Sequence, residues 1–216
     1  MFYKNTYQLF FQWLLFASVV IFLFYLAFDS GVLSSIIGSD VTRISVIIIL
    51  VFIGISCFCA WRCFVISHQI SLCIPLFEKA EDKFLYQASY SWVQDYWQTC
   101  EAGKNQSLMA EILAEKFAGA NQVGWFFSAI IIKLGLLGTV IGFVIMLSSI
   151  SSIDALVVDD IKNLMQQMTQ GMGVAMNTTM VGLVCSMLTG IQYLLLDRYC
   201  DRVLVDVIER VNQELV

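Results

Sequence analysis

Four long apolar segments alternate with more polar ones along the chain, at residues 9–28, 44–66, 125–150 and 175–196. A helix needs about 20 apolar residues to cross a bilayer, and each segment is about that long. The first is rich in Phe and no A-x-A cleavage site follows it, so we interpret it as a retained anchor helix rather than a signal peptide. The pattern predicts an all-α, polytopic membrane protein with four transmembrane helices.

The region between the second and third segments is the only sizeable polar part of the chain, and its pattern is helical. Apolar residues recur every three or four positions over 74–98, a turn is expected at 101–106, and a second helix is expected at 107–120, with Ser107 as its cap. The tail places Val203, Val207 and Val211 on one helical face. We therefore expect four parts: a transmembrane hairpin at 1–66, a helical region at 67–124, a second hairpin at 125–196, and an amphipathic tail at 197–216.

The distribution of lysine and arginine predicts the orientation in the membrane. These residues concentrate before the first span, in or beside region 67–124, and in the tail. The two remaining loops, 29–43 and 151–170, hold only Arg43 and Lys162. Because positive charge favours the cytoplasmic side, we expect both termini, region 67–124 and the tail to be cytoplasmic.

Composition narrows the possible functions. Of the 216 residues, 59% are hydrophobic and 13% charged, against about 45–50% and 25% in soluble domains. No basic run suggests nucleic-acid binding. The seven cysteines are odd in number and mostly lie in apolar stretches or on the predicted cytoplasmic side, so neither a disulfide framework nor a metal site is predicted. The sequence shows no catalytic nucleophile accompanied by an activating base. The only histidine, His68, is expected to have a structural role. We predict no catalytic residue.

The third and fourth apolar segments carry stripes of small and hydroxylated residues. In the third these are Gly135, Gly138, Thr139 and Gly142, at i, i+3, i+4 and i+7, which places them on one helical face. In the fourth a similar spacing joins Ala175, Thr178, Thr179, Gly182, Ser186, Thr189 and Gly190, and Gly171 extends the stripe upstream. Such faces allow helices to pack closely in lipid, and threonines can bond back to their own helix. Helix packing alone is therefore one open interpretation.

Two motifs on these segments support a more specific interpretation. Residues 133–142 read KLGLLGTVIG, which looks like the L-G-L-L-G-T-x-x-G segment of the MotA/TolQ/ExbB family. Residues 171–183 read GMGVAMNTTMVGL, which resembles that family's second signature, G-x-x-x-A-x-x-x-T-x-x-G-L. The signatures stand on consecutive spans in the family's order, and the resemblance covers residues 125–196. The four predicted spans agree with MotA, whereas TolQ and ExbB have three, and the subfamily is left open.

The resemblance implies a function and a set of residues. Family members form a homopentamer whose last two helices line a pore, and two copies of a single-span MotB/TolR/ExbD-like partner place their helices inside it. The partner supplies a membrane aspartate, and proton or sodium flow drives rotation in the bacterial inner membrane. On this match Thr139 and Thr179, with Thr178, belong to the ion pathway. The residues implied to line the pore and pack against partner helices are Gly135, Gly138, Gly142, Ala175, Gly182 and Ser186.

The charges in the sequence agree with this expectation. No acidic residue lies within any of the four predicted spans, so a titrating carboxylate would have to come from another chain. Transported H⁺ or Na⁺ is expected in place of a cofactor, and the adjacent pair Thr178 and Thr179 could favour sodium. Two alternatives remain: a scaffold membrane protein packed through small residues, and a membrane enzyme or autonomous transporter. The latter would need an intramembrane carboxylate or an activated nucleophile.

Overall fold

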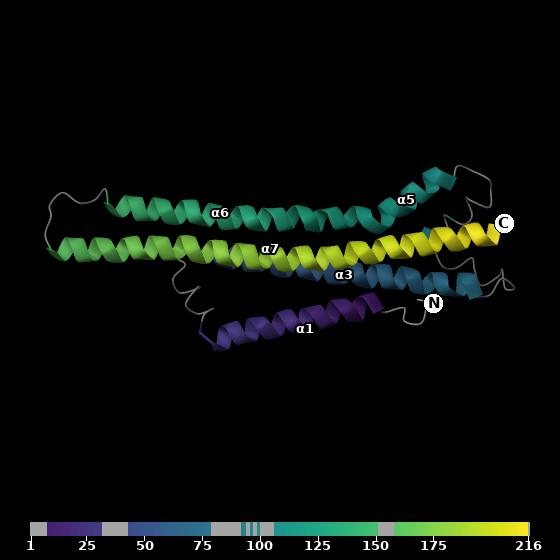
Figure 1. Cartoon of the computed structure of the whole chain (residues 1–216), viewed down its shortest axis with the longest axis horizontal. Helices are drawn as coiled ribbons and strands as arrows, with labels where there is room; N and C mark the ends of the chain where they lie inside the picture. Colours follow the sequence, from purple (N-terminus) through teal and green to yellow (C-terminus); the bar gives the residue numbers. More distant parts are fainter. Residues whose placement is uncertain are drawn as a thin grey trace. The chain divides into compact units, whose positions relative to one another are not determined.

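The computed structural model describes residues 8–31, 43–78, 92–93, 96, 99, 106–150 and 158–215. Within these ranges the secondary structure is helical and contains no strand. The helices are α1 (Gln8–Asp29), α3 (Ile44–Glu78), α5 (Gln106–Ala118), α6 (Gln122–Ile150) and α7 (Val158–Leu215), coloured along the chain in Figure 1. A 3₁₀ turn, η2 (Gly119–Asn121), joins α5 to α6.

Four described stretches of helix are long and apolar enough to cross a membrane. They are Phe11–Asp29, Ile44–His68, Ser107–Ser148 and Met165–Glu209. The all-α fold with four transmembrane helices, predicted from the apolar segments, is therefore confirmed. The third and fourth candidate stretches extend well beyond the predicted segments because helical structure continues past their apolar parts.

Helix α7 differs most from the expectation. The segment 151–170 was expected to be a loop, but α7 begins at Val158, so its second half is helical; residues 151–157 lie outside the described part. At its other end α7 continues past residue 196 to Leu215. No Gly or Pro interrupts residues 191–215, and the amphipathic tail is therefore a direct extension of the last span. Its 58 residues correspond to about 87 Å at 1.5 Å per residue, far more than a bilayer core of about 30 Å.

The predicted helices of region 67–124 are only partly within the described residues. Helix α3 continues without a break to Glu78. Most of the helix predicted at 74–98 lies outside the described residues, and so does most of the turn predicted at 101–106. The helix expected at 107–120 is confirmed, and its end tightens into η2. The prediction of Ser107 as its cap is wrong, because α5 begins at Gln106 and Ser107 lies within its first turn.

The chain divides into two compact units. One takes residues from Met1–Ala17, Cys57–Gly124 and Ile191–Val216, and the other from Ser18–Ser56 and Trp125–Gly190. The first unit has a buried core that includes Ile66, Leu113, Phe117, Tyr193 and Leu196. In the second, Phe24 of α1 stacks on Phe52 of α3 with ring centroids 6.4 Å apart.

Buried polar side chains connect the helices of the first unit. Asn121, only 1% exposed, donates from Nδ2 to Oδ1 of Asp197 on α7 at 2.8 Å. Arg62 of α3, which is 7% exposed, donates from Nη2 to the carbonyl oxygen of Phe117 at 2.9 Å. A guanidinium at this position satisfies a carbonyl left open by the end of α5 and complements the helix dipole. These contacts fix the junction between α5 and α6.

Four of the five described cysteines are buried as small packing side chains, and Cys57 is not. Among the described residues Cys59, Cys63, Cys185 and Cys200 are buried, Cys57 is exposed, and all five are free thiols. The described residues contain no group of three or more His, Cys, Asp or Glu side chains placed to hold a metal ion.

Replacing Asn121 by Leu should destabilise the protein by about 1–3 kcal/mol, because the half-buried carboxylate of Asp197 loses the N–H donor of Asn121. The measurement is the free energy of unfolding of the purified protein in mixed detergent micelles. The control is Gln213→Leu, which removes an exposed bond of 3.4 Å to Glu209 and should change the free energy by less than about 0.5 kcal/mol. Equal losses in the two variants would contradict a larger contribution from the bond between Asn121 and Asp197.

Candidate functional site: the contact between α6 and α7

The candidate site lies in the second unit, where α6 and α7 run side by side (Figure 1). Their contacts pair Ser128 with Ser186, Gly135 with Gly182, and Gly142 with Gly171. As the residue number rises on α6 it falls on α7, so the two helices are antiparallel. This places the two sequence signatures against each other.

Glycine makes the close approach of the two backbones possible. A Cβ atom added to Gly182 would lie 2.9 Å from the Cα of Gly135, and one added to Gly142 would lie 2.7 Å from the carbonyl oxygen of Gly171. Both distances are too short for a real side chain. In lipid, where apolar burial gives helices little reason to associate, such close backbone contact supplies dispersion attraction. The glycines therefore hold the hairpin together.

Thr178 belongs to this packed contact. It is fully buried, and its side chain fills the space beside Gly138. Its Oγ1 donates within its own helix, to the carbonyl oxygens of Val174 at 2.9 Å and Ala175 at 3.1 Å. Of the three predicted ion-pathway threonines it is the one enclosed by the hairpin, and its predicted ion role stays a prediction.

Thr179 and Thr139 lie at the edge of the contact. Thr179 Oγ1 is directed at the carbonyl oxygen of Ala175, at 3.1 Å, and at that of Gly135 on α6, at 3.4 Å. Thr139 is one helical turn beyond Gly135, and its Oγ1 donates to the carbonyl oxygen of Leu136. The two hydroxyls therefore share one side of the hairpin. Each uses its proton locally and keeps oxygen lone pairs that can accept a hydrogen bond from water or coordinate a cation.

A reciprocal pair of serines lies at the other end of the contact. Ser186 Oγ donates to the carbonyl oxygen of Ser128 at 2.9 Å, Ser128 Oγ donates to that of Ser186 at 3.1 Å, and the hydroxyls lie 3.0 Å apart. Both side chains are buried. Ser128 was missed by the sequence analysis, although it stands seven residues before Gly135 and so extends the same stripe.

The structure thus gives most of the predicted residues a contact within the chain. Packing between α6 and α7 involves Gly135, Gly138, Gly142, Ala175, Thr178, Gly182 and Ser186. The stripes therefore do serve to pack one helix of the chain, α6, against another, α7. Their second expected role, contact with the helices of a partner, stays a prediction.

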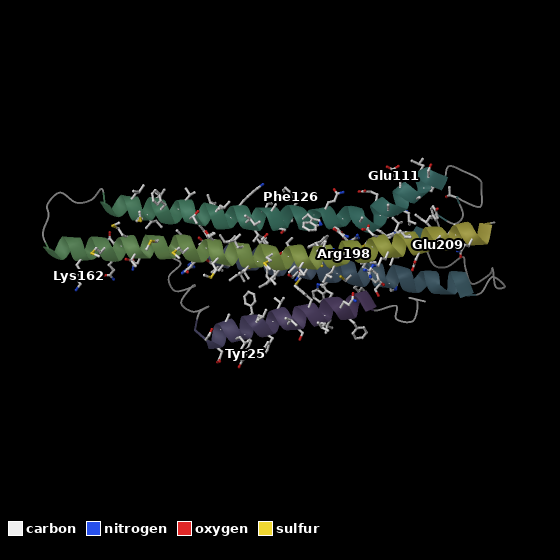
Figure 2. All side chains as sticks on the ribbon, viewed as in Figure 1. Tyr25, Glu111, Phe126, Lys162, Arg198 and Glu209 are labelled. Atoms are coloured by element: carbon white, nitrogen blue, oxygen red, sulfur yellow. The ribbon has the colours of Figure 1, made fainter. Side chains whose placement is uncertain are left out.

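Full charges are nearly absent from the hairpin. Lys133 is the only Asp, Glu, Lys, Arg or His of α6, and α7 has none between residues 165 and 196. Lys133 is exposed, and so is Phe126, which projects from α6 on the side away from α7 (Figure 2). These stretches of α6 and α7 can offer hydroxyl and carbonyl oxygens to an ion, but they contain no carboxylate to take up and release a proton.

These features define a multi-pass membrane protein: the described residues contain four helices able to span, and the last two pack tightly, with hydroxyls at one edge of their contact. The MotA/TolQ/ExbB proton channel family matches the chain over residues 82–209, more than half of its length. The chain belongs to this family. No curated protein and no solved structure matches it.

Replacing Gly182 by Ala should weaken the hairpin by about 1–3 kcal/mol, because the new methyl group would overlap the backbone of Gly135. Gly173→Ala is the matched control on the same helix, since nothing lies within 4 Å of its added Cβ atom. The control should be neutral or more stable by up to about 1 kcal/mol, through helix propensity. Unfolding by SDS in mixed micelles measures both. A Gly182→Ala protein as stable as the control would contradict the close approach.

Proposed function

We propose that this protein is the pore-forming A-type subunit of an ion-driven rotary motor. In this proposal it converts ion-motive force into mechanical work through a single-span partner similar to MotB, TolR or ExbD. The observation that carries the proposal is the family match, which covers both spans of the hairpin and both signatures. The protein acts as a channel component and has no enzymatic activity.

The absence of a carboxylate from the spans of α6 and α7 supports an assembly that contains a second kind of chain. A proton or sodium ion crossing the bilayer needs a group that binds it, and the hairpin contains no Asp or Glu between residues 165 and 196. A partner helix carrying an aspartate supplies this group. We propose a homopentamer around two copies of that partner, with H⁺ or Na⁺ as the transported ion and no other cofactor.

Within this assembly the two edge threonines serve the ion. Thr139 and Thr179 present their oxygen lone pairs beside the partner's carboxylate, where they order water for proton transfer or coordinate sodium. The chain lies in the bacterial inner membrane with both termini in the cytoplasm, as its lysines and arginines favour. Helix α5 and the end of α7, which bears Arg198 and Glu209 (Figure 2), then lie on the cytoplasmic side.

A scaffold protein is the second candidate. The observation in its favour is that the small residues of both signatures already pack within the chain. A scaffold needs the glycines but makes no use of the threonine oxygens, so the two functions differ in their response to loss of a hydroxyl.

Thr179→Val should reduce ion flux through the purified complex at least about 10-fold, because it keeps the shape and removes the oxygen that serves the ion. Thr179→Ser should retain most of the flux. The measurement is dye-detected H⁺ or Na⁺ entry into vesicles containing the co-purified complex. Native mass spectrometry of each variant should still show five copies, about 122 kDa from five chains of 24.4 kDa.

The control is Ser148→Ala, which removes an exposed hydroxyl that donates to its own helix, to the carbonyl oxygen of Ile145 at 2.8 Å. It should leave the flux unchanged. Full flux in an intact Thr179→Val complex would favour the scaffold, and a monomer in several mild detergents would exclude the ring.

A further inference from the structure

The junction of η2 with α3 and α7, in the first unit, contains two buried polar atoms that have no hydrogen-bond partner among the described residues. They are Nε of Arg62 and Oδ1 of Asn121. The two side chains are 7% and 1% exposed. An N–H or carbonyl group buried without a partner destabilises a folded protein, so nearly all such groups are bonded to protein or to ordered water.

The orientation of the Asn121 amide is determined by its neighbours. Its Nδ2 donates to Oδ1 of Asp197 at 2.8 Å and to Sγ of Cys200 at 3.7 Å. An ionised carboxylate only accepts hydrogen bonds, so the amide nitrogen must face Asp197. Exchanging the nitrogen and the oxygen would set two acceptors against each other. The amide oxygen therefore faces another direction, in which it needs a donor.

The guanidinium of Arg62 lies beside this amide. Its Nη2 donates to the carbonyl oxygen of Phe117 at 2.9 Å. A carbonyl in a helix points along the axis toward the residue four positions later, which here is Asn121. A donor without a partner, Nε of Arg62, and an acceptor without a partner, Oδ1 of Asn121, are thus both at the end of α5.

Aromatic side chains separate this junction from bulk water. Phe117 is 1% exposed, and the ring of Trp92 packs edge-on against it with centroids 5.4 Å apart. Tyr193 is fully buried, and its ring occupies the place that a Cβ atom on Gly124 would take. Freely exchanging solvent therefore does not satisfy the two polar atoms, and a ligand held inside the junction is required.

We propose that the junction binds one ordered water molecule, which accepts a hydrogen bond from Nε of Arg62 and donates one to Oδ1 of Asn121. An anion would accept from Nε but would be repelled by the amide oxygen and by the nearby carboxylate of Asp197. A cation would be repelled by the guanidinium. Water both donates and accepts, and a buried water typically has about two to four polar partners.

This water completes a chain of hydrogen bonds across three elements of the first unit. The chain runs from Arg62 on α3 through the water to Asn121 in η2, and from Asn121 to Asp197 on α7. It also gives the buried guanidinium a second partner besides the carbonyl of Phe117, which lowers the cost of burying its charge. The site involves none of the threonines assigned to the ion and does not depend on the proposed function.

The first test is a structure of the full-length protein in lipid nanodiscs at about 2 Å resolution. A density peak should lie about 2.7–3.2 Å from both Nε of Arg62 and Oδ1 of Asn121. A direct hydrogen bond between these two atoms, a side chain of another protein in this place, or the absence of a peak would overturn the proposal.

The second test measures oxidation of buried thiols by pulsed X-rays, which split ordered water into hydroxyl radicals that attack the nearest side chains. Cys200, bonded to Asn121, is 1% exposed, and the control, Cys185 of the second unit, is 2% exposed. Mass spectrometry of the intact protein after millisecond exposures should show Cys200 oxidised at least about 5-fold faster than Cys185, because the radical source lies inside the junction. Equal rates for the two thiols would contradict the water site.

Discussion

The close contact between the backbones of α6 and α7 is the feature on which the rest of the hairpin depends. A Cβ atom added to Gly182 would lie 2.9 Å from the Cα of Gly135, too close for a real side chain, and one added to Gly135 would lie 3.3 Å from the Cα of Gly182. Water is absent from the hydrocarbon region, so the attraction between these helices comes from dispersion between near backbones and from hydrogen bonds such as those between Ser128 and Ser186. The same contact holds Thr179 beside the carbonyl of Gly135 and leaves the opposite sides of both helices for other neighbours.

Helix α6 and residues 165–196 of α7 contain oxygen ligands without titratable acids, and this division has a physical reason. In the ring that we propose, a carboxylate fixed in the wall of each copy would place several like charges in a region of low dielectric constant, at high cost. Hydroxyls assist an ion at every position around a ring without carrying charge themselves. A single acid carried on a separate helix can then be shared among equivalent sites.

Much of the fold could be predicted from the sequence, because lipid imposes strong rules on helix length and polarity. The four spans followed from the apolar segments, and α5 was expected as the helix that follows the turn at 101–106. The start of α7 at Val158 did not, because the polar residues before the last span resemble a loop although nothing in them breaks a helix. The small residues of the two stripes meet in the contact between α6 and α7, which the sequence could not show, because a stripe alone does not reveal which helix it faces. Arg62 was counted only as a charge near the cytoplasm, and its burial against the end of α5 depends on contacts between residues 55 positions apart.

The uninterrupted length of α7 has a consequence for its backbone hydrogen bonds. About 20 residues suffice to cross the hydrocarbon of a bilayer, so more than half of the 58 residues of α7 must lie outside it. A helix that ended at the membrane surface would leave its last four carbonyl oxygens there without partners within the helix. Because α7 continues to Leu215, the carbonyl oxygens at the membrane surface are bonded within the helix itself.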